Sequence, residues 1–232
     1  ELHVSHGADS YRIALKRVAG ATRFTIRVRS ATRDVVLTMP VRGSLKAAQD
    51  FAQRHAAWIG ARMNRLPKPV PFHPLATIPF EGAPHIVLHE PDARGTVWVG
   101  ATNKGEAALH VAGDERHVHR RVMDFLKREA RKRLEDAVKR HCAKLNVKAR
   151  DVTLRDTTSR WGSCSASGGL NFSWRLIMAP PHVLDYLAAH ECAHLIHMNH
   201  SDEFWALTRK LSKDVDRSEA WLKAHGASLH RY

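Results

Sequence analysis

The stretch HECAHLIHMNH, residues 190–200, constrains this 232-residue chain more than any other. If it is helical, His190 and His194 lie one turn apart and project from the same face, with Glu191 beside them. Two imidazoles placed in this way can reach one metal ion, and the glutamate can hold and deprotonate a water molecule in an open coordination position. We therefore expect a helix that carries a catalytic metal centre.

A metal held in this way needs a third protein ligand, and His200 is the candidate. It follows His194 by six residues, as the last histidine does in H-E-x-x-H-x-x-G-x-x-H zinc sites, although His197 stands where those sites have glycine. The helix must end before His200, and we predict the turn at Met198 and Asn199, because asparagine can adopt the left-handed conformation. We do not expect His197 to be a ligand, since four protein ligands would close the catalytic position.

Composition places the chain among globular proteins, with 44% hydrophobic and 26% charged residues. No window approaches the ~18 apolar residues of a membrane span, and the three cysteines do not suggest a disulfide framework, so we expect a cytoplasmic protein without a membrane partner. The net charge of +14 predicts attraction to polyanions such as nucleic acid. The alternative is that charges in segments such as residues 127–140 pair along a solvated helix.

Periodicity predicts an α+β fold in two halves. Short β-rich runs in residues 10–40 suggest a small antiparallel sheet, and one helix capped by Ser44 should cover residues 45–66. A proline-rich segment, residues 67–74, then interrupts the chain before further strands. We divide the chain into a β-rich N-terminal region with one helix, residues 1–112, and a catalytic region, residues 113–232. No internal repeat is evident.

The catalytic region should begin with a long helix that ends near Leu145. Two strands, residues 151–158 and 169–178, would flank a loop that contains Arg160 and Trp161, and three helices would complete the chain. Arg160 and Trp161 are candidate substrate-binding residues, since a guanidinium can hold a carboxylate or phosphate and an indole can cover a site. Equally, the two side chains could only pack and pin the loop to the metal-bearing helix.

Residues 157–211 resemble the YgjP-like metallopeptidase-domain family, which is related to SprT-like and WLM-type zincins. Residues 27–59 and 221–232 are similar to the family as well, so the resemblance covers nearly the whole chain. It implies a zincin-like catalytic half of the minimal gluzincin type. It also implies that Zn²⁺ is bound by three histidines and that a glutamate is the general base. The residues concerned are His190, His194, His200 and Glu191.

The leading functional hypothesis is a zinc-dependent metallopeptidase acting on a peptide or protein. A second hypothesis keeps the metal but changes the substrate to a nucleotide or another phosphate ester, because a basic surface and a Lewis-acidic ion suit phosphates. A third is a nucleic-acid-binding module, or a DNA-dependent protease by analogy with SprT-like proteins. The sequence does not give the oligomeric state, and other divalent metals remain alternatives to zinc.

Overall fold

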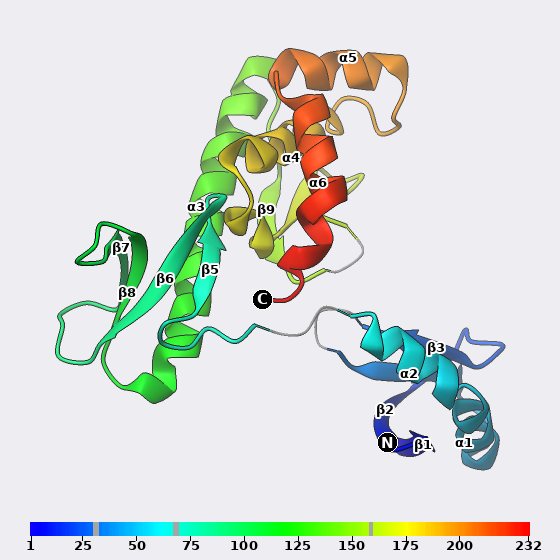
Figure 1. The fold of residues 1–232 in the computed structure, drawn as a ribbon. Helices are drawn as coiled ribbons and strands as arrows, with labels where there is room; N and C mark the ends of the chain where they lie inside the picture. Colours follow the sequence, from blue (N-terminus) through cyan, green and yellow to red (C-terminus); the bar gives the residue numbers. More distant parts are fainter. Residues whose placement is uncertain (30–32, 67–69, 158–159) are drawn as a thin grey trace. The chain divides into compact units, whose positions relative to one another are not determined.

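The computed structural model describes residues 1–29, 33–66, 70–157 and 160–232, and the chain forms two compact units (Figure 1). The units are Glu1–Lys68 and Pro69–Tyr232. The boundary that we expected after residue 112 therefore falls inside the second unit. The reason is that the strands before residue 112 share a core with the long helix that follows them, through residues such as Ile78, Leu109 and Leu126.

The first unit is a four-stranded sheet with two helices. Its strands have the order β1-β2-β4-β3, and β2 and β4 are parallel, so the sheet is mixed rather than antiparallel. The helix that we predicted over residues 45–66 is broken at His55, while the predicted cap, the Ser44 hydroxyl, accepts a hydrogen bond from the Ala47 amide. The elements are β1 (Leu2–His6), β2 (Asp9–Val18), β3 (Thr25–Val28), β4 (Val35–Pro40), α1 (Leu45–Arg54) and α2 (Ala56–Asn64).

The second unit opens with another four-stranded sheet that repeats this topology. Its order is β5-β6-β8-β7, with β6 and β8 parallel and both outer pairs antiparallel, just as in the first sheet. The sequence shows no matching repeat, so the correspondence lies in strand order and direction. The elements are β5 (Thr77–Phe80), β6 (Ala83–Glu90), β7 (Val97–Ala101) and β8 (Ala107–Ala112).

The rest of the second unit combines a small sheet with four α-helices, and its strand order is β10-β11-β9. The strand predicted over residues 169–178 ends at Ser173, and the predicted loop contains the short strand β10. Within the described residues, no helix is both long and apolar enough to span a bilayer. The elements are η1 (Glu115–His117), α3 (Val118–Leu145), β9 (Asp151–Arg155), β10 (Gly162–Cys164), β11 (Gly169–Ser173), η2 (Trp174–Met178), α4 (Pro181–Ala193), α5 (Asp202–Leu211) and α6 (Val215–Leu229).

The tip of the β5–β6 hairpin anchors the segment that leads into α4. Its two central residues, Glu81 and Gly82, have φ values of 49° and 81°, as a tight two-residue hairpin turn requires. Their amides donate hydrogen bonds to the carbonyls of Ile177 and Met178, at 2.8 and 3.2 Å. The turn thus holds the chain three residues before α4 begins at Pro181.

We predict that Gly82→Ala destabilises the protein more than Gly105→Ala. Both glycines have φ near 80°, so an added Cβ costs each about 1–2 kcal/mol. At Gly82 the Cβ would also lie 2.8 Å from the Pro180 Cα, whereas at Gly105 it would meet nothing within 4 Å. We expect a further loss of about 1–3 kcal/mol in the free energy of unfolding for Gly82→Ala, measured by urea denaturation. Equal losses would contradict the anchoring role of the hairpin.

Candidate metal centre

Helix α4 is buried among α3, η2, β10, α5 and α6, which together fix its direction. Its first turn begins with Pro181, whose missing N–H group costs little there. Asp185 ties the helix to α3, because its carboxylate accepts hydrogen bonds from His141 Nε2 and Arg140 Nη2, each at 3.0 Å. These contacts hold the following two turns of α4, which carry the metal motif, in one place.

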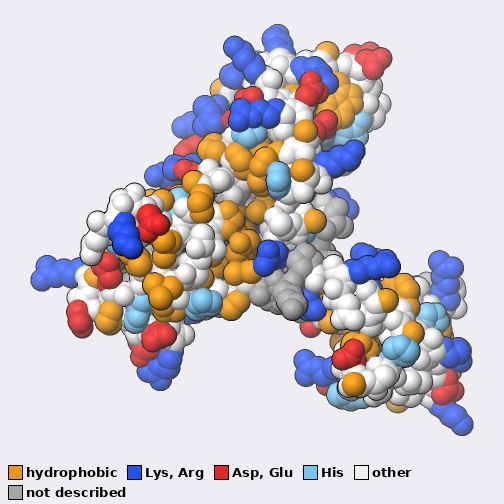
Figure 2. Space-filling view, in the orientation of Figure 1, with side chains coloured by type: hydrophobic (Ala, Val, Ile, Leu, Met, Phe, Trp, Pro, Cys, Tyr) orange, Lys and Arg blue, Asp and Glu red, His pale blue; other side chains and the backbone are white. Residues whose placement is uncertain are grey.

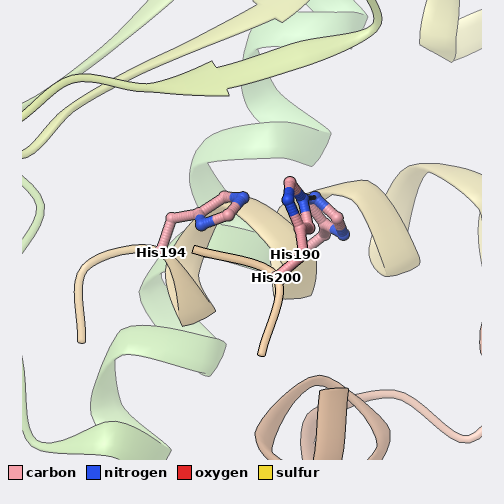
Figure 3. Close-up of side chains that lie close together, drawn as sticks. All are labelled: His190, His194 and His200. Atoms are coloured by element: carbon pink, nitrogen blue, oxygen red, sulfur yellow. Dashed lines mark hydrogen bonds between the residues drawn. The ribbon is translucent and has the colours of Figure 1, made fainter. Parts of the chain in front are cut away.

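The structure brings His190, His194 and His200 together, as their spacing predicts (Figure 3). One ring nitrogen from each lies within 4.8 Å of the other two, and the Nε2 atoms of His190 and His200 are 3.2 Å apart. His190 belongs to α4, His194 caps it, and His200 stands in the segment before α5. Three converging imidazole nitrogens are a donor set that suits zinc, so the residues present fit this ion.

The helix that carries the histidine motif ends earlier than we predicted. Helix α4 ends at Ala193, with His194 as its cap in the right-handed conformation, and Asn199 does not have a positive φ. The predicted helix end at Met198 and Asn199 is therefore wrong, although the chain does bend at these two residues. His197 contributes its backbone: the carbonyl oxygen accepts a hydrogen bond from His194 Nδ1 at 2.9 Å. That bond leaves His194 Nε2 free as a ligand atom.

The ring of Phe204, in α5, packs against all three histidine rings of the cluster. This ring is fully buried, stacks on His194 at 4.4 Å between centroids, and meets the edges of His190 and His200 at 4.9 Å. The Ser201 hydroxyl caps α5 and accepts a hydrogen bond from the Phe204 amide, so the cap places this ring. Phe204 was not among the residues that we predicted for the site. The sequence did contain one signal for it. Ser201, which caps α5, directly follows His200, and Phe204 comes three residues after this cap.

A hydrogen-bonded chain extends from His190 to α6. The Tyr186 hydroxyl donates to Glu219 at 2.8 Å, and its oxygen lies 3.5 Å from His190 Nδ1. Burial, followed by the bond to Glu219, raises the Tyr186 pKa, so the phenol stays neutral. Tyr186 and Glu219 were not predicted as parts of the site. Only Tyr186 gave a signal, since it precedes His190 by one helical turn.

Burial disfavours the charged form of two of the ligand candidates, His190 and His194. Burial, followed by the neighbouring rings of His194 and His200, lowers the pKa of His190 to about 4. Burial is also the main reason why the pKa of His194 is lowered. Metal binding requires the neutral imidazole, so both rings are already in the state that can bind an ion.

Glu191 is a buried carboxyl group, 4% exposed, and its Oε2 has no hydrogen-bond partner among the described residues. Burial raises its pKa to about 8, and the positive charge of Arg160 opposes this rise. Gly162 of β10 passes directly over it, because a Cβ at that position would lie 2.8 Å from the Glu191 Cγ. Glycine is therefore needed here for close approach to the carboxyl group.

Arg160 and Trp161 differ in their surroundings. Trp161 is half-buried, stacks on His230 with 4.9 Å between ring centroids, and packs against Gly226 of α6, which favours the packing role. Arg160 is exposed, and together with Arg155 it lines a cavity of about 280 Å³ that also borders β10 and β11. Of the two, Arg160 is the one that remains available for a substrate.

Comparison with known proteins gives two matches. The crystal structure of the metallopeptidase zymogen of Pyrococcus abyssi abylysin is similar over 39% of this chain and 95% of its own, with 22% sequence identity and a TM-score of 0.34. No curated protein matches the chain. The family model of the YgjP-like metallopeptidase domain matches residues 22–225. This chain therefore belongs to the YgjP-like metallopeptidase-domain family.

Proposed function

We propose that this metallopeptidase uses zinc and that Glu191 is its general base. The observation that carries the proposal is the convergence of three imidazole nitrogens beside a buried carboxyl group whose Oε2 has no partner in the described part of the chain. His190, His194 and His200 would hold the ion, each through one ring nitrogen. A buried carboxyl group without a partner is costly, which is an argument for a functional role.

The protein residues supply the proton transfers. When bound, a zinc ion supplies Lewis acidity that activates water and polarises a carbonyl group. Glu191 takes a proton from the attacking water and passes it to the departing amine, a contribution of typically ~10²–10⁴-fold in rate. In the protein without metal, burial raises the pKa of this carboxyl group to about 8, and the positive charge of Arg160 favours the ionised form, which is the form that accepts a proton.

The edge of the small sheet offers a place for an extended peptide. Strand β10 is an edge strand, because the order β10-β11-β9 leaves one of its sides without a neighbouring strand. It also packs against α4, and Gly162 brings its backbone next to Glu191. Backbone pairing along such an edge binds peptides with little dependence on their sequence. We place the substrate along β10, with its scissile bond near Glu191.

A second candidate function is hydrolysis of a nucleotide or another phosphate ester at the same centre. The observation that favours it is the pair Arg155 and Arg160, which line one cavity near β10. Guanidinium groups bind phosphate well, although Arg155 already donates a hydrogen bond to Asn171 at 3.0 Å. Proteolysis that is stimulated by DNA is a variant of the first proposal. Assays with unfolded protein, with and without DNA, and with nucleoside triphosphates separate the three.

We predict that His200→Ala loses the metal while His197→Ala keeps it. His200 contributes a ring nitrogen to the cluster, whereas His197 contributes only its backbone carbonyl. Elemental analysis of untagged protein should give about one zinc per chain in the wild type and in His197→Ala, and clearly less in His200→Ala. Equal metal content in all three proteins, or none in the wild type, would refute the three-histidine site.

Glu191→Gln should abolish peptide hydrolysis without loss of zinc. The amide has nearly the shape of the carboxyl group but cannot accept the water proton, so the rate should fall by about 10²–10⁴-fold. The measurement is turnover of an unfolded protein substrate, together with the metal content of the same preparation. A variant that keeps its activity would rule out Glu191 as the general base, whatever the metal content.

Phe204→Leu should weaken zinc binding more than Leu211→Ala. Both residues belong to the same small core cluster, but only Phe204 contacts the three histidine rings. Residues that orient metal ligands typically change metal affinity about 10–100-fold, so we expect a loss in that range for Phe204→Leu. Competition with a chelator measures the affinity, and thermal unfolding compares the stabilities. If zinc affinity follows stability alone in the two variants, Phe204 has no positioning role.

A further inference from the structure

The positive charge of the chain is concentrated in its first unit. Residues 1–68 contain thirteen Lys and Arg residues and four Asp and Glu residues, and therefore carry nine of the fourteen net positive charges. The remaining 164 residues balance twenty-four basic residues with nineteen acidic ones. Along α3 several of these charges pair, as Arg120 does with Asp124 and Arg131 with Glu135. A polyanion would thus be drawn mainly to the first unit, where Figure 2 shows Lys and Arg side chains on the visible face.

A groove on this unit is lined by three arginine side chains and a tryptophan ring. The Trp58 groove has a volume of about 460 Å³ and runs between α2 and the edge strand β3. Trp58, Arg62 and Arg65 follow one another at four- and three-residue steps, so they share one face of α2. Ile26, Arg27 and Val28 of β3 form the opposite wall.

The groups that line the groove are without partners in the described part of the chain. Arg27, Arg62 and Arg65 are exposed, and none forms an ion pair or a side-chain hydrogen bond with a described residue, while all four acidic residues of the unit are described. Trp58 is 49% exposed, a large aromatic surface left in water. Among the described strands β3 pairs with β4 alone, so no described strand covers its outer backbone edge.

We propose that the Trp58 groove binds single-stranded nucleic acid. Its phosphates would contact Arg27, Arg62 and Arg65, and one base would stack on the Trp58 ring. A single strand offers negative charge and unpaired planar bases together, which is the combination that cationic grooves with aromatic platforms bind. Duplex DNA presents the phosphates but keeps its base faces inside the stack, so it cannot use Trp58 in this way. The groove lies in a different unit from the histidine cluster, and its function does not depend on hydrolysis.

The test uses the full chain and a fluorescein-labelled oligothymidylate of twenty nucleotides, with binding followed by fluorescence anisotropy. Binding should weaken with salt, with a contribution of about 2 to the log–log slope from three arginine–phosphate contacts at ~0.7 each. Trp58→Ala should weaken binding by roughly 10-fold, within the range known for base stacking on aromatic residues, and Trp58→Phe should restore most of it. A matched duplex should bind more weakly and should not respond to Trp58→Ala.

The arginines are tested against a charge-matched control. The double variant Arg62→Gln, Arg65→Gln should bind more weakly and with a shallower salt slope than the double variant Lys46→Gln, Arg54→Gln, which removes two exposed charges from α1 outside the groove. His200→Ala should bind the oligonucleotide as the wild type does, so failure of the zinc proposal and failure of this one can be told apart.

Three outcomes would overturn the proposal: no binding of the single strand at low salt, equal losses in the two double variants, or displacement by polyglutamate as effective as displacement by unlabelled oligothymidylate. Absence of binding would mean that single-stranded nucleic acid is not the ligand. Equal losses in the two double variants would mean that binding depends on net charge alone. Equal displacement by polyglutamate would mean that the groove recognises any polyanion. Thermal unfolding of each variant shows that a loss of binding is not a loss of fold.

Discussion

The burial of α4 is the constraint on which the rest of the second unit depends. This helix carries three polar residues of the metal motif, yet it is enclosed by other elements, and Glu191 is only 4% exposed. Polar groups removed from water destabilise a fold unless they gain partners. The surroundings provide partners for the histidines, through the His197 carbonyl and the Tyr186 hydroxyl, but none in the described part of the chain for the Glu191 Oε2. The carboxyl group left without one is the group to which we assign proton transfer.

The parts of the fold and of the site that could be predicted are those set by local geometry. His190 and His194 share a helix face because they are four residues apart, and Ser44 and Ser201 cap helices because a hydroxyl satisfies a free amide close to it in sequence. The end of α4 could not be predicted in this way. The helix ends at Ala193, and the chain then brings His200 next to His190 and His194, an arrangement of tertiary structure that local spacing does not give.

The pairing of strands in the sheets could not be predicted from local geometry either. The pairs β2–β4 and β6–β8 are parallel and join segments well separated in sequence, so alternation of apolar residues locates the strands without giving their neighbours. For this reason the repeated order of the two four-stranded sheets was not detected in the sequence. The same strand order is completed differently in each unit. In the first, α1 and α2 pack on the sheet, where Ile59 of α2 shares a core with Leu37 of β4, while α3 packs on the second sheet.

This difference in how each sheet is completed explains why the two units differ in surface chemistry. Helix α3 packs against a large core along much of its length. Its exposed charges include several pairs of opposite sign. Helix α2 buries only a few small or apolar residues, among them Ala56 and Ile59, and its other face is free to carry Trp58 and two arginines. A short helix beside an edge strand can therefore display unpaired cations without cost to a core. We attribute to this difference between the helices the fact that the exposed arginines of the groove lie in the first unit, whereas the histidine cluster lies in the second.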